Sequence, residues 1–227
     1  PTSFTSSFLD SDYSGYDISC YNFNDGWIDF TIGGSVSPYN YTWSGPNGYT
    51  SSTEDINSLY AGTYFLNIVD NNGCIFNTNI NLTEPSNITS ILASTMDYNG
   101  YDISCFGALD GGISSLVNGG IAPYNLLWDN GQTSPSLTNL PSGSYQLSIT
   151  DLNGCISTNS ISLIEPLELI SYIQSSNNYN GYDISCIGML DGGVQVSVAG
   201  GISPYDYIWN TGAVSQNLNN ISAGQYS

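Results

Sequence analysis

The 227-residue sequence contains no lysine, no arginine and no histidine, whereas its 19 aspartates and glutamates give a formal net charge of −19. Nucleic-acid binding and adhesion to anionic lipids both depend on lysine and arginine to neutralise phosphates. The missing bases therefore exclude nucleic acids and anionic membrane surfaces as partners. Without histidine, only carboxylates could act as general acid and base, and no Asp-Thr-Gly or Asp-Ser-Gly triplet suggests a catalytic dyad. We expect no enzymatic activity.

Charge and long apolar runs are also scarce. Charged residues make up 8% of the sequence, against about 25% in ordinary domains. No apolar run approaches the roughly 18 residues of a membrane-spanning helix, so we expect no membrane insertion, and no signal peptide is visible. Hydrophobic residues still account for 40%, which argues against disorder. The absence of trypsin sites is explained either by compositional drift in a repeat array or by selection for a protease-resistant exterior.

An internal repeat organises the chain. The hexapeptide Gly-Tyr-Asp-Ile-Ser-Cys is present three times, at residues 15–20, 100–105 and 181–186. Spacings of 85 and 81 residues mark a repeated unit, and Asp-Gly and Pro-Tyr pairs follow each copy in register. Aligning the copies predicts three domains, at residues 1–84, 85–165 and 166–227. The third lacks a counterpart of residues 147–165, so we expect it to be truncated at its C-terminal end, as in a segment of a longer chain.

Short alternating segments bounded by glycine, proline and asparagine predict about seven strands in each domain and no helix. Alternation is clearest at residues 194–198, where three valines alternate with polar residues. The hexapeptide is itself predicted to form a strand, with Tyr16, Ile18 and Cys20 on one face. These features predict an all-β fold made of tandem immunoglobulin-like β-sandwich repeats.

Recurring turn motifs support the same fold. Asn72-Gly73 and its counterpart at residues 153–154 each separate two predicted strands, and Asn-Gly is a strong hairpin signal. A Leu, Gly and Tyr pattern at residues 59–64 resembles the tyrosine corner of immunoglobulin-like sandwiches. The domains meet at Glu84-Pro85 and Glu165-Pro166 with no flexible linker. The sequence therefore predicts a stiff, linear rod.

Aromatic residues are abundant, with 18 tyrosines and 4 tryptophans, and they allow two interpretations. Tyr39, Tyr41 and Trp43 share one face of a predicted strand, where exposed rings could bind sugars. Packing in a core is the favoured interpretation. The side chains that we predict to fill the cores recur in register: Trp43, Trp128, Trp209, Tyr64, Tyr145 and Tyr226.

Repeated aspartates are weak candidates for metal binding. Six of them recur in register: Asp17, Asp25, Asp70, Asp102, Asp110 and Asp151. With no cationic side chain to pair with, these carboxylates need backbone N–H groups, hydroxyls, water or metal ions. Calcium prefers such oxygens, but no Asp-x-Asp-x-Asp-Gly loop is present. Turn capping is the favoured interpretation, so we expect no cofactor, with calcium as the alternative.

The five cysteines allow two regular disulfide schemes. Pairing within domains would join Cys20 to Cys74 and Cys105 to Cys155, and Cys186 would pair beyond Ser227. Pairing across boundaries would join Cys74 to Cys105 and Cys155 to Cys186, and would leave Cys20 for an upstream partner. A small secreted domain needs its own cross-link, and closing a loop of about 54 residues restricts the unfolded chain by roughly 4 kcal/mol. We therefore predict the pairing within domains.

The order of these motifs resembles the SprB-type repeat of very large cell-surface adhesins from gliding bacteria. In the second domain the motifs occupy residues 105–111, 119–128, 140–145, 151–155 and 165–166. The first domain departs from the pattern at Asn22, where the others have Gly107 and Gly188. The resemblance implies an extracellular filament, secreted through the outer membrane and displayed on the cell surface, that serves attachment and gliding motility.

The partners expected from this reading are an external surface or polysaccharide and the neighbouring repeats of the same chain. A carbohydrate-binding module array on a secreted protein is the alternative function. Lateral self-association of chains is a further expectation. Because the charge is of one sign throughout, such association should be stronger when salt screens the repulsion.

Overall fold

The computed structural model describes residues 3–227. The first predicted domain begins at Pro1, and residues 1 and 2 lie outside the described residues. Within the described residues the protein is almost entirely β, with several small antiparallel sheets and one short 3-10 turn at Pro46–Gly48. The predicted fold class, all-β with immunoglobulin-like sandwiches, is confirmed.

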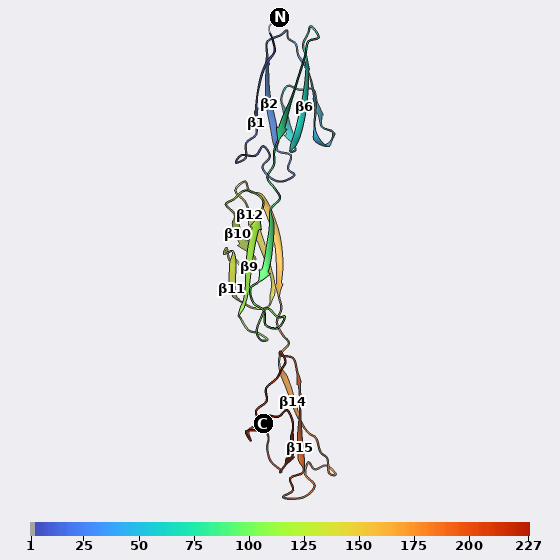
Figure 1. Cartoon of the computed structure of the whole chain (residues 1–227), viewed down its shortest axis with the longest axis vertical. Helices are drawn as coiled ribbons and strands as arrows, with labels where there is room; N and C mark the ends of the chain where they lie inside the picture. The colour runs from blue at the N-terminus through green and yellow to red at the C-terminus, as the bar shows by residue number, and fades with distance from the viewer. Residues whose placement is uncertain (1–2) are drawn as a thin grey trace. The chain divides into compact units, whose positions relative to one another are not determined.

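Similar strands recur in the three segments that the sequence repeat defines (Figure 1). Those before residue 84 are β1 (Thr5–Asp10), β2 (Gly26–Gly33), β3 (Asn40–Ser44), β4 (Thr50–Ser51), β5 (Ile56–Leu59), β6 (Gly62–Val69) and β7 (Ile75–Leu82). Those between residues 85 and 165 are β8 (Thr89–Ser94), β9 (Gly111–Asn118), β10 (Asn125–Trp128), β11 (Ser136–Leu140), β12 (Gly143–Thr150) and β13 (Ile156–Leu163). The remaining strands are β14 (Ile170–Ser175), β15 (Gly192–Ala199) and β16 (Leu218–Ile221).

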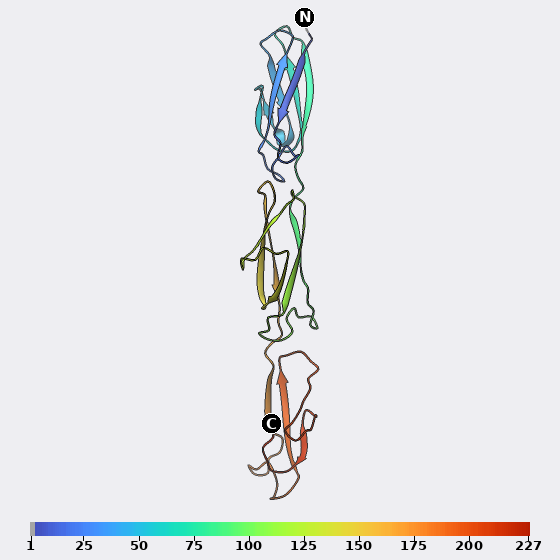
Figure 2. The same ribbon diagram turned by 90° about the vertical axis from the view of Figure 1, so that its left-hand side faces the viewer.

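The strands before residue 84 form a sandwich of two sheets, ordered β1-β2-β5 and β4-β3-β6-β7. Strand β2 pairs with β1 along its length, as Figure 2 shows, and its residues alternate between buried and exposed. The ring of Phe30 on β2 meets the ring of Trp43 on β3 edge to face, with centroids 5.9 Å apart. This contact joins the two sheets at the centre of the first core.

Equivalent sheets recur later in the chain. Between residues 85 and 165 the sheets are β11-β9-β8 and β10-β12-β13, and the last strands form the sheet β14-β15-β16. Cα clustering divides the chain into two compact units. The first combines the chain up to Leu92 with Ser115–Pro135 and Gln146–Ser160; the second combines Ala93–Ser114, Ser136–Tyr145 and Ile161–Ser227. Two features predicted from the sequence stay predictions. They are the domain boundaries at residues 84/85 and 165/166 and the arrangement of the domains in a linear rod.

The predicted core side chains are largely confirmed. Trp43, Trp128, Trp209, Tyr64 and Tyr145 are all buried. Tyr226 is an exception, because it is only half-buried against the cluster of Val196, Trp209 and Leu218.

The predicted tyrosine corner is also present. The Tyr64 hydroxyl donates to the main-chain oxygen of Tyr60 at 3.0 Å, and Tyr145 and Tyr226 bind the oxygens of Pro141 and Ser222 in the same way. In each case the acceptor lies four residues upstream. This geometry is typical of immunoglobulin-like sandwiches.

One predicted strand is wrong. Residues 15–20 form a bent loop, and Ile18, Ser19 and Cys20 are buried in succession instead of alternating. The N–H groups of Asp17 and Ile18 both donate to the main-chain oxygen of Thr83, while the Asp17 carboxylate accepts from the N–H of Thr83. Such side-chain-to-backbone bonds compete with a sheet ladder, which explains why an alternating sequence forms no strand here.

Within residues 3–227, no helix has the length and apolar character needed to cross a lipid bilayer.

Candidate functional site at the Cys20–Cys155 disulfide

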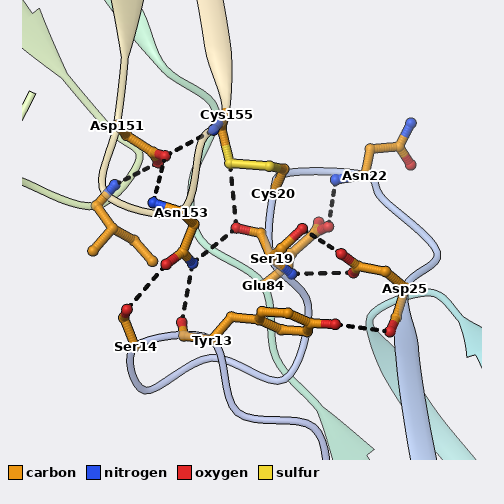
Figure 3. The surroundings of a disulfide bond; sticks show 11 residues. Tyr13, Ser14, Ser19, Cys20, Asn22, Asp25, Glu84, Asp151, Asn153 and Cys155 are labelled. Atoms are coloured by element: carbon orange, nitrogen blue, oxygen red, sulfur yellow. Dashed lines mark hydrogen bonds between the residues drawn. A yellow bond between two sulfur atoms is a disulfide. The ribbon is translucent and has the colours of Figure 1, made fainter. Parts of the chain in front are cut away.

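A disulfide joins Cys20 to Cys155, with Cα atoms 5.7 Å apart and a sequence separation of 135 positions. The bond lies within the first compact unit and links the loop after β1 to the turn before β13 (Figure 3). Cys20 and Cys155 are buried, whereas Cys74, Cys105 and Cys186 are free and exposed. Both predicted pairing schemes are therefore wrong, including the favoured bonds from Cys20 to Cys74 and from Cys105 to Cys155.

The length of β7 explains why Cys20 and Cys74 do not pair. Cys74 directly precedes β7, whereas the hexapeptide loop is bonded to Thr83, just after the strand's last residue. Eight residues of strand separate those two ends by about 26 Å. A disulfide needs Cα atoms within about 7 Å, so one sandwich cannot close this bond.

Residues 11–20 lie on one side of the disulfide and are called the socket loop. The N–H groups of Tyr13 and Tyr16 each donate to the other residue's main-chain oxygen, and the N–H of Gly15 donates to Asp12 Oδ1 at 2.8 Å. At the other end of the loop, the N–H and hydroxyl of Ser19 both donate to the Asp25 carboxylate. These bonds fix the loop's main-chain oxygens in place.

Residues 151–155 lie on the other side of the disulfide and are called the plug turn. Asp151 Oδ1 accepts the N–H groups of Asn153 at 3.0 Å and Cys155 at 2.9 Å, and Oδ2 accepts the N–H of Ile121. The Asp151 side chain is buried. One carboxylate therefore shapes the turn and anchors it to the preceding loop.

The side chain of Asn153 lies between the two elements (Figure 3). Its Nδ2 donates to the main-chain oxygens of Tyr13 and Ser19, each at 3.1 Å, and its Oδ1 accepts from the Ser14 hydroxyl at 3.0 Å. The Cys155 sulfur, which carries no proton in a disulfide, lies 3.3 Å from the Ser19 oxygen. The Asn153 amide thus makes hydrogen bonds to three polar groups of the socket loop, beside the Cys20–Cys155 disulfide.

The motif of the plug turn offered a signal for Asn153, because Asp-x-Asn-Gly-Cys occurs at residues 70–74 and 151–155. We interpreted the asparagine as a hairpin residue only. In the structure the glycines of both motifs have positive φ, and the Asn153 side chain bonds to the socket loop.

The glutamate of the Glu-Pro junction was also missed. Glu84 accepts the N–H of Asn22, and Glu165 Oε2 accepts the N–H of Gly107 at 2.7 Å. Asn22, Gly107 and Gly188 all have positive φ. Asparagine tolerates this conformation better than most residues, so the departure at Asn22 keeps the local geometry.

The six candidate metal ligands act as hydrogen-bond acceptors. Backbone N–H groups donate to Asp17, Asp25, Asp70, Asp102, Asp110 and Asp151. Within the described residues, no three acidic or cysteine side chains gather in a metal-holding group. The turn-capping interpretation is confirmed for Asp70 and Asp151, which each bond the N–H groups two and four residues on.

Hydrogen bonds also set the acidity of two of these carboxylates. The Ser35 hydroxyl, which donates to Asp70, holds the pKa of Asp70 below its usual value, and the N–H groups of Cys74 and Asn72 add to the effect. The Ser104 hydroxyl and N–H lower the pKa of Asp110 in the same way. Both carboxylates are therefore favoured in their charged form without any cation.

The aromatic row at residues 39–43, on β3 and the residue just before it, packs against the core. Trp43 is buried, and Tyr39 and Tyr41 are partly buried against the same cluster. The Tyr39 hydroxyl donates to the main-chain oxygen of Gly34, and burial raises the pKa of Tyr41 beside Glu54. The interpretation as core packing is confirmed for Trp43, whereas Tyr39 and Tyr41 pack against the core and keep part of their surface exposed.

The fold and the site together define a class: repeated immunoglobulin-like sandwiches with a disulfide between repeats. The SprB repeat family model matches residues 101–133 and 180–214. These two matches support a SprB-type repeat region, and the SprB repeat is found in cell-surface adhesins. Among curated proteins, none matches the sequence significantly.

Similar solved structures include a fragment of intimin, repeats of a large adhesion protein and murine CEACAM1b. A C-terminal fragment of intimin, crystallised with the intimin-binding domain of the translocated intimin receptor, shares 13% identity with a TM-score of 0.36, covering 74% of this chain and 66% of that one. A tetra-tandem repeat from the extending region of a large adhesion protein shares 14% identity (TM-score 0.33; 98% and 66% covered). Murine CEACAM1b shares 14% (TM-score 0.27; 64% and 94% covered). Likeness at this level supports no conclusion about function.

Proposed function

We propose that the chain is a structural and adhesive repeat segment of a secreted filament on a bacterial cell surface, serving surface attachment and gliding motility. The observation that carries the proposal is the Cys20–Cys155 bond, which ties two consecutive repeats together. A filament that attaches a moving cell is pulled along its length. A covalent bond between repeats holds under a pull that would separate a noncovalent interface.

The disulfide also supports an extracellular location. Disulfides persist in oxidising environments and are rare in reducing cytosol. Secretion through an outer-membrane system is part of the proposal and is supported by the SprB family match alone. We further propose that the chain is not an enzyme and needs no cofactor, since its repeated carboxylates are engaged by backbone N–H groups.

The proposed partners are an external surface or polysaccharide and the neighbouring repeats of the same chain. The repeat–repeat contact is supported by the three hydrogen bonds of Asn153. Lateral association between chains belongs to the same proposal. At a net charge of −19 it should increase with salt, because screening weakens like-charge repulsion.

The test uses antibodies raised against the 227-residue chain. On intact cells of the producing bacterium, we expect surface labelling that is removed by a protease cutting at aromatic or acidic residues. Deleting the coding region should reduce both attached cells and gliding speed, and restoring it should recover both. Labelling that appears only after lysis, or unchanged attachment in the deletion strain, would overturn the proposal.

A further inference from the structure

The plug turn and the socket loop each recur where no partner is bound. A second plug motif occupies residues 70–74, and two further socket loops occupy residues 96–105 and 177–186. The cysteines of these elements are the three free, exposed ones: Cys74, Cys105 and Cys186. The occupied pair at Cys20 and Cys155 shows what each element binds.

The plug turn at residues 70–74 has the geometry of the occupied one. Asp70 Oδ1 accepts the N–H groups of Asn72 at 2.9 Å and Cys74 at 2.7 Å, as Asp151 does for Asn153 and Cys155. The N–H of Asn71 donates to the oxygen of Val36 at 3.0 Å, matching the bond from Leu152 to Ile121. The turn is therefore shaped before any partner arrives, and it presents an exposed Asn72 beside an exposed thiol.

The other socket loops repeat the hydrogen bonds that position the two carbonyl acceptors of the occupied socket loop. Tyr98 and Tyr101 exchange main-chain bonds, as do Tyr179 and Tyr182, repeating the pair of Tyr13 and Tyr16. The N–H of Ser104 donates to Asp110 at 3.1 Å, and the N–H of Ser185 donates to Asp191 at 3.2 Å.

Ser14, whose hydroxyl donates to Asn153 Oδ1, has hydrogen-bond donors at the equivalent positions of the other two socket loops. Ser14 has a φ of 58°, and its counterparts Asn99 and Asn180 have φ values of 54° and 53°. An asparagine amide can donate to a carbonyl oxygen as the serine hydroxyl does. The two free socket loops therefore keep both carbonyl acceptors and the side-chain donor that hold the plug asparagine.

We propose that the plug turn at residues 70–74 and the socket loops at residues 96–105 and 177–186 are docking sites for another copy of this repeat. Each binds its complementary half, with the plug asparagine amide on the socket carbonyls and one disulfide closing the contact. The contact uses neutral amides, hydroxyls and carbonyls, so it forms despite the uniformly negative charge of both partners. The other copy comes from the same polypeptide or from a second chain, and the binding chemistry is the same in both cases.

Closing each bond is a two-electron oxidation. The two cysteine thiols lose two protons and two electrons to a disulfide oxidant such as oxidised glutathione, which leaves as two thiols. Docking aligns one plug thiol with one socket thiol, so plug-to-socket bonds should form in preference to plug-to-plug or socket-to-socket bonds.

The first arm of the test provides the partner in a second chain. The 227-residue chain is oxidised with oxidised glutathione at several concentrations, digested without reduction by chymotrypsin and an acid-specific protease, and mapped by mass spectrometry. We expect covalent dimers in which Cys74 is joined to Cys186 or Cys105, at least about tenfold over Cys74–Cys74 and Cys105–Cys186 links. Asn72→Ala should lower the plug-to-socket yield about tenfold, whereas Asn71→Ala, which alters the neighbouring exposed residue, should not.

The second arm provides the partner in the same chain. A variant with residues 85–165 duplicated in tandem gains one complete plug turn, and we expect Cys105 of the first copy to pair with the cysteine of the added plug turn in a monomer. Links in either arm support the proposal and identify the source of the partner. The proposal is overturned if both arms give free Cys105 and Cys74, if like-with-like links are as frequent, or if Asn72→Ala and Asn71→Ala behave alike. None of these readouts depends on attachment to a surface, so this test and that of the proposed function fail independently.

Discussion

The side-chain nitrogen of Asn153 lies 3.1 Å from the main-chain oxygen of Ser19, although 134 residues separate them in the chain. This hydrogen bond places a turn from one repeat in a loop of the repeat before it, beside the Cys20–Cys155 disulfide. The contact is local in space and very distant in sequence. It turns two adjacent sandwiches into covalently linked neighbours.

Loss of the disulfide should destabilise the protein more than loss of any free thiol. Cross-linking residues that lie 135 positions apart restricts the unfolded chain by about 5 kcal/mol in the loop-entropy model. Cys155→Ser should therefore lower the denaturant midpoint clearly, whereas Cys74→Ser, which alters an exposed free cysteine, should not. Equal midpoints for the two variants would contradict the observed pairing.

The disulfide should also limit how far the chain extends under force. Residues 21–154 lie inside the closed loop. A force on the chain ends is therefore transmitted through the disulfide and does not stretch these residues. Reduction should release roughly 450 Å of additional contour length. Single-molecule stretching with and without reductant measures this gain, and a Cys20→Ser/Cys155→Ser variant should show it in both conditions.

Removing the Asn153 side chain should weaken the junction without affecting the sandwich cores. Asn153→Ala deletes three hydrogen bonds to the socket loop, and losses of this kind cost about 1–3 kcal/mol. Hydrogen exchange should become faster at residues 13–19. Leu152→Ala is the matched control, since that side chain is exposed; if it accelerates exchange equally, Asn153 has no special role.

The tyrosine corner should contribute measurably to the first sandwich. Tyr64→Phe removes the hydroxyl that donates to the Tyr60 oxygen and should cost about 1 kcal/mol, read as a lower melting temperature. Tyr60→Phe keeps the accepting main-chain oxygen and alters only a side chain exposed to solvent. No difference between the two variants would show that the corner bond does not stabilise the fold.

The hydrogen bonds around Asp70 predict a loss of stability in acid. The pKa of Asp70 is lower in the folded protein than the ordinary value of 3.8, so its contribution to stability is present above pH 3.8 and is lost as the pH falls through the folded value. Asp70→Asn should reduce stability near neutral pH and flatten the acid limb of a denaturation curve. Asp129→Asn, at an exposed site, should leave that limb unchanged.

The repeated pattern in the sequence predicted much of the local structure, although not the hexapeptide loop. The alternating valines at residues 194–198 predicted β15, because a strand sends alternate side chains to opposite faces, and all three valines belong to or pack against one buried cluster. The register of the tryptophans predicted the cores, and the tyrosine spacing predicted the corner bond of Tyr64. These features depend on residues that are close in sequence or on burial alone.

The tertiary structure decided the disulfide and the site around it. The sequence places Cys20 and Cys74 in one repeat, but β7 holds them at opposite ends of one sandwich, out of reach of each other. The alternation of the hexapeptide favoured a strand, but bonds from Asp17 and Ile18 to Thr83 bend it into a loop. Which cysteine meets which depends on where strand ends lie in space, and that follows from the packing of consecutive repeats, which spacing along the chain does not encode.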